Sequence, residues 1–274
     1  MERLIFVEII NCDFDLVHTF ECGQCFRWNR VEDNMYIGVV GNSVITVKQD
    51  ENKFVFDSND ELLLNSYFDF NKDYCKVKKE LSLLDDVLKK AIPSGYGIRL
   101  LKQNPWEALV SFIISANNNI PRIKKIIENL CSNFGNEIIH NNNVYYTFPD
   151  AETLSKLSVE QLDVIKSGFR AKYIVDAAKK VVGGTVNLEN VYDMNTYEAR
   201  EYLKQIKGVG NKVADCVLLF AYQKYDVFPK DVWIKKVLND LYGIDEKNFD
   251  SFVNEHFGKM AGFAQQYLFY YMRG

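Results

Sequence analysis

The chain has 274 residues, of which 47% are hydrophobic and 14% aromatic, so it can bury a sizeable core in two or three subdomains. It contains no run of about 18 apolar residues, which excludes an ordinary membrane-spanning helix. The first ten residues include two acids and alternate like a strand rather than like a signal peptide. Together with scattered cysteines, they predict a reduced, cytoplasmic protein that would associate with the nucleoid in a bacterium.

The net charge of −4 is unusual for a DNA-binding protein, and it is unevenly distributed. Residues 1–100 hold 12 basic and 17 acidic side chains, whereas residues 101–274 hold 21 and 20. The second part is therefore close to neutral. If it binds DNA, we expect backbone amides and a few arginines to make the contacts, with a modest dependence on salt.

The N-terminal part of the chain has the pattern of an antiparallel sheet. Residues 3–10, 35–41, 43–49 and 52–57 alternate or run apolar, and Gly41-Asn42 between two of these runs is typical of a hairpin turn. A C-x-x-C pair at residues 22–25 is compatible with a metal or redox site, but no second pair accompanies it. Buried thiols in a strand region are the favoured interpretation.

From about residue 72 the apolar residues follow a helical period, and strands are not expected after about residue 105. A helix beginning at Pro105 ends at three asparagines, and Pro121 lies at the start of another helix. Residues 135–149 are polar and glycine-containing and predict a surface loop, after which helices continue to the end.

The predicted fold class is therefore α+β, with two domains. Residues 1–100 form an N-terminal antiparallel sheet domain with a helix at its end. Residues 101–274 form an all-helical domain that contains a helical hairpin at about residues 196–223.

The hairpin is the most informative stretch of the chain. Two helical periods meet at Gly208-Val209-Gly210, where two glycines allow a tight turn with positive φ and leave the backbone N–H groups uncovered. Such N–H groups, at the start of the helix that follows, suit a phosphate oxygen. We therefore expect Gly208 and Gly210 to contact a DNA phosphate, as in a helix-hairpin-helix element.

Two charged residues lie at helix starts in and after this hairpin. Lys212 is in the first turn of the second helix, where the positive end of the helix dipole favours a neutral, nucleophilic amine. Asp231 precedes Val232-Trp233-Ile234 and has the position of a helix N-cap. A solvated lysine and a purely structural cap explain the same residues. On these two residues alone, the structural explanation is favoured.

The motif G-V-G-x-K-V-A-D-C followed by F-P-x-D resembles the signature of the 8-oxoguanine branch of the helix-hairpin-helix DNA glycosylases. In that family the lysine forms a Schiff base with the sugar, and the aspartate is its electrostatic partner. The resemblance therefore implies that Lys212 and Asp231 are the catalytic residues. Two residues after the aspartate, where close relatives often have a histidine that touches phosphate, this chain has Trp233.

Two further motifs imply contacts with the base opposite the lesion. The sequence N-N-N-I-P-R at residues 117–122 matches the family pattern N-N-N-I-x-R, which implies that Asn117 fills the space of the extruded base and that Arg122 reads the orphaned cytosine. The sequence G-F-R-A at residues 168–171 corresponds to a family pattern G-Y-R-A. By that resemblance Phe169 is the wedge in the duplex and Arg170 is a second reader.

Two more motifs imply the pocket for the lesion. The sequence G-Q-C-F-R-W at residues 23–28 resembles the family's G-Q-x-F-R-W, and a Gly23 carbonyl would accept the N7 proton that 8-oxoguanine has and guanine lacks. In A-Q-Q-Y-L-F at residues 264–269, Gln265 and Phe269 are four apart on one helical face and would bond and stack on the base. Cys216 would cover its other side.

The resemblance implies a bifunctional glycosylase and lyase that removes 8-oxoguanine from duplex DNA, preferably opposite cytosine, by base flipping, Schiff-base formation and β-elimination. Its partner is double-stranded DNA that contains the lesion. We expect a monomer that contacts no membrane, requires no cofactor and has no catalytic metal. A separate hypothesis is that the carbonyls of residues 207–210 hold a monovalent cation against a phosphate.

Three alternatives remain open. A pyrimidine glycosylase like endonuclease III shares the lysine and aspartate but normally has a C-terminal four-cysteine cluster, and the last cysteine here is Cys216. An alkylpurine glycosylase keeps the aspartate and lacks the lysine. A non-catalytic module that only docks on DNA has no need for Lys212.

Overall fold

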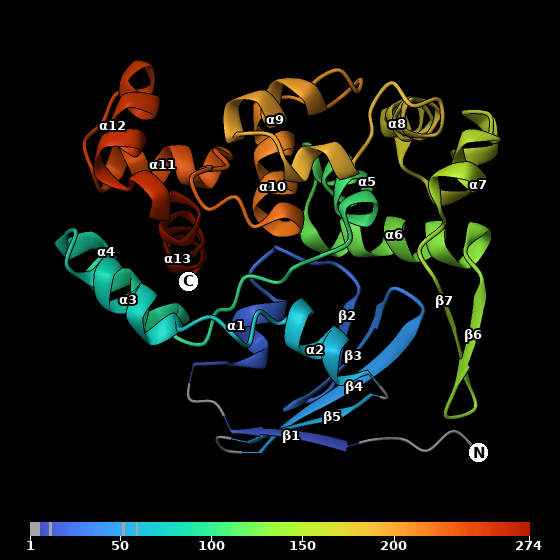
Figure 1. Cartoon of the computed structure of the whole chain (residues 1–274), viewed down its shortest axis with the longest axis horizontal. Coiled ribbons are helices and arrows are strands. Elements are labelled where there is room, and N and C mark those ends of the chain that lie inside the picture. The colour runs from blue at the N-terminus through green and yellow to red at the C-terminus, as the bar shows by residue number, and fades with distance from the viewer. Residues whose placement is uncertain (1–5, 11–12, 51–52, 59) are drawn as a thin grey trace.

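A computed structural model describes residues 6–10, 13–50, 53–58 and 60–274 of the chain. An N-terminal sheet lies below a larger helical body in the view of Figure 1. This arrangement confirms the α+β class, with the antiparallel sheet first and the helices after it.

The sheet has five antiparallel strands in the order β1-β5-β4-β3-β2. The strands are β1 (Phe6–Ile10), β2 (Trp28–Glu32), β3 (Met35–Val40), β4 (Ser43–Asp50) and β5 (Lys53–Asp57). The four expected strands agree with β1, β3, β4 and β5, although residues 3–5 and 52 of the expected ranges lie outside the described residues.

Strand β2 is an edge strand that the sequence pattern does not predict. Only Trp28 in it is buried, so its residues lack the alternation that marks a half-buried strand. The Trp28 ring stacks on Phe20 with the centroids 4.2 Å apart. It also covers Gly38 on β3, where a Cβ atom would lie 2.5 Å from the indole.

Short helices connect the sheet to the helical body. They are α1 (Leu16–Phe20), α2 (Glu61–Tyr67), α3 (Tyr74–Ser82), α4 (Asp86–Ala91) and the 3-10 helix η1 (Ile92–Gly95). Each of α1 to α4 begins after an aspartate whose carboxylate accepts a backbone N–H of the first turn. Residues of α3 and α4 belong to the same hydrophobic core as the later helices, so the helical body includes part of the first 100 residues. The division of the chain at residue 100 stays a prediction.

The remaining elements build the helical body. The α-helices are α5 (Pro105–Ser115), α6 (Ile120–Phe134), α7 (Ala151–Ser155), α8 (Ala171–Val182), α9 (Thr196–Leu203), α10 (Asn211–Tyr222), α11 (Val232–Asp240), α12 (Phe249–His256) and α13 (Ala261–Arg273). The 3-10 helices are η2 (Glu160–Ile165), η3 (Gly168–Arg170), η4 (Glu189–Tyr192), η5 (Glu246–Asn248) and η6 (Gly258–Met260). Helices α5 and α10 pack against each other and are almost entirely buried.

The expectation of a loop at residues 135–149, with no strands after residue 105, is wrong. Strands β6 (Glu137–His140) and β7 (Asn143–Tyr146) form an antiparallel hairpin there, which Figure 1 shows running down beside the sheet. Its turn consists of Asn141 and Asn142, both with positive φ, as a two-residue hairpin turn requires. The strands are only four residues long and mostly exposed, so their sequence carries little strand pattern.

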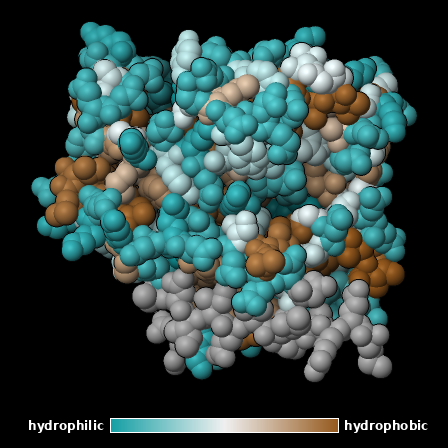
Figure 2. All heavy atoms as spheres, viewed as in Figure 1, coloured by the Kyte–Doolittle hydropathy of each residue, from teal (hydrophilic) through white to brown (hydrophobic). Residues whose placement is uncertain are grey.

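None of the helices in the described part of the chain has the length and apolar character that a bilayer-spanning helix needs. The face seen in Figure 2 is mainly hydrophilic, and the hydrophobic patches that its described residues form are separate from one another.

Candidate active site

The hairpin predicted at about residues 196–223 is formed by α9, a turn and α10. Gly208 has a φ of +82°, and a Cβ atom there would lie 2.5 Å from the Tyr173 ring on α8. Helix α8 also accepts the turn's Lys207 N–H through Asp176 Oδ2 at 2.8 Å. Both contacts hold the turn against α8.

Gly210 is the N-cap of α10, and, apart from Gly210 itself and its chain neighbours, no heavy atom lies within 4 Å of a Cβ built on it. The next residue, Asn211, is exposed. The start of α10 is therefore uncovered around Gly210 and Asn211. A contact between its backbone N–H groups and a phosphate stays a prediction.

Lys212 projects from the first turn of α10 toward the end of α5. Its Nζ donates a hydrogen bond to Ser115 Oγ at 3.3 Å and lies 5.5 Å from the centroid of the Phe112 ring. The side chain is half-buried, with an aromatic face and a hydroxyl group as its neighbours. The hydrogen-bond partner of the amine is therefore a neutral hydroxyl group rather than a carboxylate.

Asp231 is the N-cap of α11, as predicted, and its Oδ1 accepts the Ile234 N–H at 2.9 Å. The cap fixes the carboxylate of a residue that lines the same cavity as Lys212. Trp233, two residues later, is 46% exposed on the first turn of α11.

The cavity at Lys212 brings together every residue predicted for catalysis and for the lesion pocket. Its walls come from the loop after α1, from α5, α10 and α13, and from the segment before α11. Its lining residues are Cys22, Gly23, Phe112, Lys212, Cys216, Phe220, Pro229, Asp231, Gln265, Gln266 and Phe269. Segments far apart in sequence thus form one site.

Apart from Lys212 and Asp231, the residues that line the cavity are uncharged, and one of their polar atoms has no partner. Burial raises the pKa of the Cys216 thiol to about 11, so the group is uncharged at neutral pH. Gln265 is 5% exposed, and its Oε1 has no hydrogen-bond partner within the protein. Such a buried acceptor is costly unless a ligand group bonds it.

The loop that carries Gly23 is held by a buried amide network. Gln24 donates through Nε2 to the Arg99 carbonyl at 2.7 Å, and its Oε1 accepts the Leu101 N–H at 2.9 Å. Gln266 donates to the Cys22 carbonyl at 2.9 Å. These contacts fix the backbone around Gly23, whose φ of +81° suits glycine.

Sequence reasoning did not identify Cys22, Gln266, Phe112, Phe220 and Pro229 as pocket residues. Gln266 carried one signal, because it is a second amide in the apolar helix α13. The aromatic residues carried none, since their periodicity fits any buried helix face.

The predicted opposite-base residues separate into two groups. Asn117 is exposed with a φ of +50°, Arg122 is exposed, and Phe169 is 52% exposed. Arg170, by contrast, is 3% exposed, and its guanidinium donates hydrogen bonds to backbone carbonyls. The structure therefore does not present Arg170 at the surface as it does the other three.

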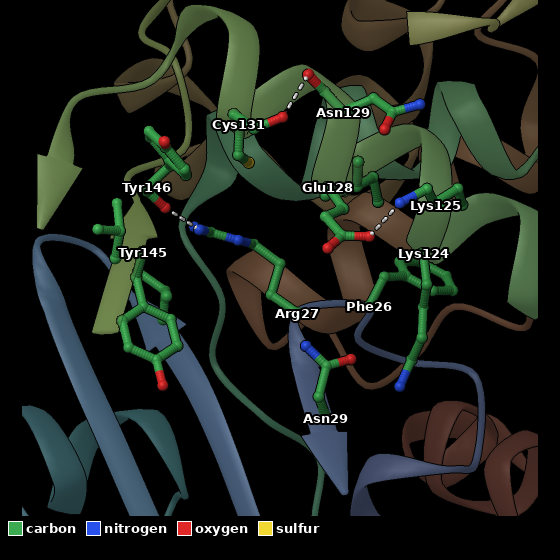
Figure 3. A pocket seen from close by; sticks show the side chains of 14 residues that line it. Phe26, Arg27, Asn29, Lys124, Lys125, Glu128, Asn129, Cys131, Tyr145 and Tyr146 are labelled. Atoms are coloured by element: carbon green, nitrogen blue, oxygen red, sulfur yellow. Dashed lines mark hydrogen bonds and ion pairs between the residues drawn. The ribbon is translucent and has the colours of Figure 1, made fainter. Parts of the chain in front are cut away.

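A larger cavity, of about 380 Å³, lies between β2, α6 and β7 and contains none of the predicted residues (Figure 3). Its cations already have partners. Arg27 bonds the Tyr146 carbonyl and pairs with Glu107 at 3.5 Å. Lys125 pairs with Glu128 at 3.0 Å. Lys124 donates to the Trp28 carbonyl, so each of the three cations that line the cavity already has a hydrogen-bond acceptor within the protein.

One group of potential metal ligands occurs among the described residues, at Asp13, Asp73 and Cys75. It lies apart from the cavity at Lys212, and Asp13 is already paired with Lys78 at 2.7 Å. Cys22 and Cys25 are buried free thiols, and burial raises the pKa of Cys22 to about 11. They agree with the interpretation as buried thiols rather than a redox pair.

A helical hairpin beside a cavity with a lysine and an aspartate defines a DNA glycosylase of the helix-hairpin-helix class. Residues 7–109 match the family model of the N-terminal domain of 8-oxoguanine DNA glycosylase, and residues 110–261 match that of HhH-GPD superfamily base excision DNA repair proteins. The chain belongs to the 8-oxoguanine DNA glycosylase family. Membership confirms the predicted enzyme class, an N-glycosylase with DNA lyase activity that acts in base excision repair.

Relatives agree over most of the chain. It is 34% identical over 259 residues to the N-glycosylase/DNA lyase of Saccharomyces cerevisiae, covering 84% of this chain and 68% of that protein. The structure resembles that of MBOgg1 bound to a low-affinity DNA ligand, with 47% identity, a TM-score of 0.95 and coverage of 100% and 97%. It also resembles the Clostridium acetobutylicum 8-oxoguanine glycosylase/lyase bound to double-stranded DNA with cytosine opposite 8-oxoguanine, with 41% identity, a TM-score of 0.92 and coverage of 100% and 99%.

Proposed function

We propose that the chain excises 8-oxoguanine from duplex DNA, preferably opposite cytosine, and then nicks the strand. The observation that carries this proposal is the single cavity shared by Lys212, Asp231, Gly23, Gln265 and Phe269. It contains a nucleophile, a carboxylate, an amide, an aromatic ring and an uncovered backbone, which together suit an extruded purine nucleotide.

Recognition of the lesion depends on Gly23 and α13. The Gly23 carbonyl accepts the N7 proton of 8-oxoguanine and repels the N7 lone pair of guanine. Gln265 bonds the Watson–Crick edge, and Phe269 and Cys216 cover the two faces of the base. A Phe269 ring carbon lies 3.3 Å from the position that a Cβ atom on Gly23 would take, so the ring packs closely against this loop.

The chemistry begins with the Lys212 amine as the nucleophile. Its nitrogen attacks C1′, the bond from C1′ to the base breaks, and the base leaves with the electron pair and takes up a proton. Asp231 stabilises the positive charge that develops on the sugar. The attached nitrogen then gives up a proton, its lone pair displaces O4′ from C1′, and O4′ takes up a proton, so that the opened sugar is held as a Schiff base. Loss of a C2′ proton expels the 3′ phosphate and leaves the nick.

The exposed residues Phe169, Asn117 and Arg122 contact the base stack and the base opposite the lesion. Phe169 enters the stack, Asn117 fills the vacated space, and Arg122 bonds the orphaned cytosine. Gly208 and Gly210 hold a phosphate of the damaged strand at the start of α10. A cation bound by the carbonyls of residues 207–210 would reinforce that contact.

The compartment, the monomeric state and the absence of a cofactor stay predictions. A monomer is supported by the site itself, because one chain supplies the nucleophile, the carboxylate, the pocket and the hairpin.

The test is product analysis on end-labelled duplexes that contain one 8-oxoguanine opposite cytosine, with unmodified guanine and thymine glycol as controls. We expect excision on the first duplex and a nick without added alkali. Preferential cleavage of thymine glycol would contradict the pocket assignments. Alkali-dependent strand breaks alone would contradict the lyase step.

A further inference from the structure

The Arg170 side chain lies inside the protein rather than at its surface. Its Nε donates to the Ala116 carbonyl at 2.9 Å, and its Nη2 donates to the carbonyls of Ala116 at 2.5 Å and Asn117 at 2.8 Å. Its Nη1 donates to the Ser167 carbonyl at 3.2 Å. Four of the five guanidinium N–H groups therefore bond backbone oxygens.

Those carbonyls lie at a bend that needs support. Ala116 is the C-cap of α5, where the last carbonyls of the helix lack partners within the helix. Asn117 follows with a φ of +50°, a left-handed conformation that is uncommon for a residue other than glycine. The carbonyls of Ala116 and Asn117 both accept hydrogen bonds from the Arg170 guanidinium, which fixes the bend. The bend in turn directs the exposed Asn117 side chain outward.

The same guanidinium supports the predicted wedge. Its central carbon lies 4.4 Å from the centroid of the Phe169 ring, a cation–π distance. Burial lowers the pKa of the Arg170 guanidinium, and the nearby positive charge of Arg122 lowers it further. One buried cation thus joins the Asn117 bend and the Phe169 loop, which are 52 residues apart in the sequence.

We propose that Arg170 is a positioning residue that holds Asn117 and Phe169 in the geometry for base extrusion, whichever base is opposite the lesion. The proposal rests on the proposed function and assigns Arg170 a role besides base reading. The alternative is that Arg170 serves only to recognise cytosine. In that case, its loss would not matter where no cytosine is present.

The experiment compares Arg170→Lys with Arg122→Lys in single-turnover excision. One duplex carries 8-oxoguanine opposite cytosine, and the other carries it opposite a tetrahydrofuran abasic analogue, which offers no base to read. We expect Arg170→Lys to slow excision at least tenfold on both duplexes, because lysine keeps the charge and loses the planar fork. Arg122→Lys should instead remove most of the advantage of the cytosine duplex.

A double-mutant cycle separates positioning from a general structural role. If Arg170 acts mainly through Asn117, Arg170→Lys should slow excision much less in an Asn117→Ala background than in the wild type. Equal effects of Arg170→Lys in the wild type and in both the Asn117→Ala and Phe169→Ala backgrounds would overturn the proposal, as would wild-type rates of Arg170→Lys on the abasic duplex. Wild-type excision of 8-oxoguanine is measured in the same series, so failure of the proposed function is distinguishable.

A structure of the borohydride-trapped wild-type complex provides a readout that needs no variant. We expect the guanidinium of Arg170 to keep its bonds to the Ala116 and Asn117 carbonyls. A guanidinium that has left both carbonyls would overturn the proposal.

Discussion

Substitutions of the neighbouring residues Gln265 and Gln266 are predicted to change the free energy of unfolding in opposite directions. Both side chains are buried on α13, but only Gln266 has a carbonyl partner, at Cys22, whereas Gln265 Oε1 has no partner within the protein. Methionine has nearly the same length and lacks the amide. Gln265→Met and Gln266→Met are therefore matched variants that differ in the hydrogen bond they remove.

The expected magnitudes follow from those contacts. A buried acceptor without a partner costs about 1–3 kcal/mol, so Gln265→Met should keep or raise the free energy of unfolding. Gln266→Met leaves the Cys22 carbonyl unpaired and should lower the free energy of unfolding by about 1–3 kcal/mol. For a chain of this length, about 1 kcal/mol corresponds to a shift of roughly 2–4 °C in the melting temperature.

Excision should change in a different way. Loss of the bond from Gln265 to the base should slow single-turnover excision by about tenfold, the equivalent of about 1.4 kcal/mol, although the protein is no less stable. Thermal unfolding and excision are measured on the same preparations. If Gln265→Met destabilises the protein as much as Gln266→Met does, Gln265 is a structural residue and the reasoning is refuted.

Three further predictions concern the hairpin and the cavity. Gly208→Ala should lower stability by more than about 1 kcal/mol and weaken DNA binding, because of its φ of +82° and the Tyr173 ring, whereas Gly210→Ala should unfold like the wild type in a thermal scan. Asp231→Asn should keep the melting temperature, since asparagine also caps helices, but lose excision; a large fall in melting temperature would contradict this. Burial raises the pKa of Cys216 to about 11, so the unfolded thiol ionises first. The stability advantage of the wild type over Cys216→Ala should therefore shrink as pH rises from 9 to 11, as denaturant titrations at each pH would show.

The sequence predicted the parts of the site that depend on local pattern. The helix starts at Lys212 and Asp231 were predicted from a glycine turn and an N-cap pattern, and the structure places both residues there. Their catalytic roles were implied by the family motif and not by the local pattern. Gly23, Gln265 and Phe269 were identified from motifs, and they meet in one cavity with the charged pair.

Features that depend on distant contacts were missed. The burial of Arg170 depends on the carbonyls at the end of α5, and no pattern near residue 170 indicates it. Strand β2 and the β6–β7 hairpin are short and mostly exposed, so hydrophobic alternation does not mark them. Their existence is decided by pairing and by neighbouring elements.

The most direct measurement is borohydride trapping followed by peptide mapping. The duplex carries 8-oxoguanine opposite cytosine, and the proteins are the wild type, Lys212→Gln and Lys90→Gln, a control for loss of one exposed positive charge on α4. We expect the wild type and Lys90→Gln to form a covalent adduct that maps to Lys212, and Lys212→Gln to form none while still binding the duplex. An adduct on another residue, or trapping that persists in Lys212→Gln, would contradict the assignment of the nucleophile.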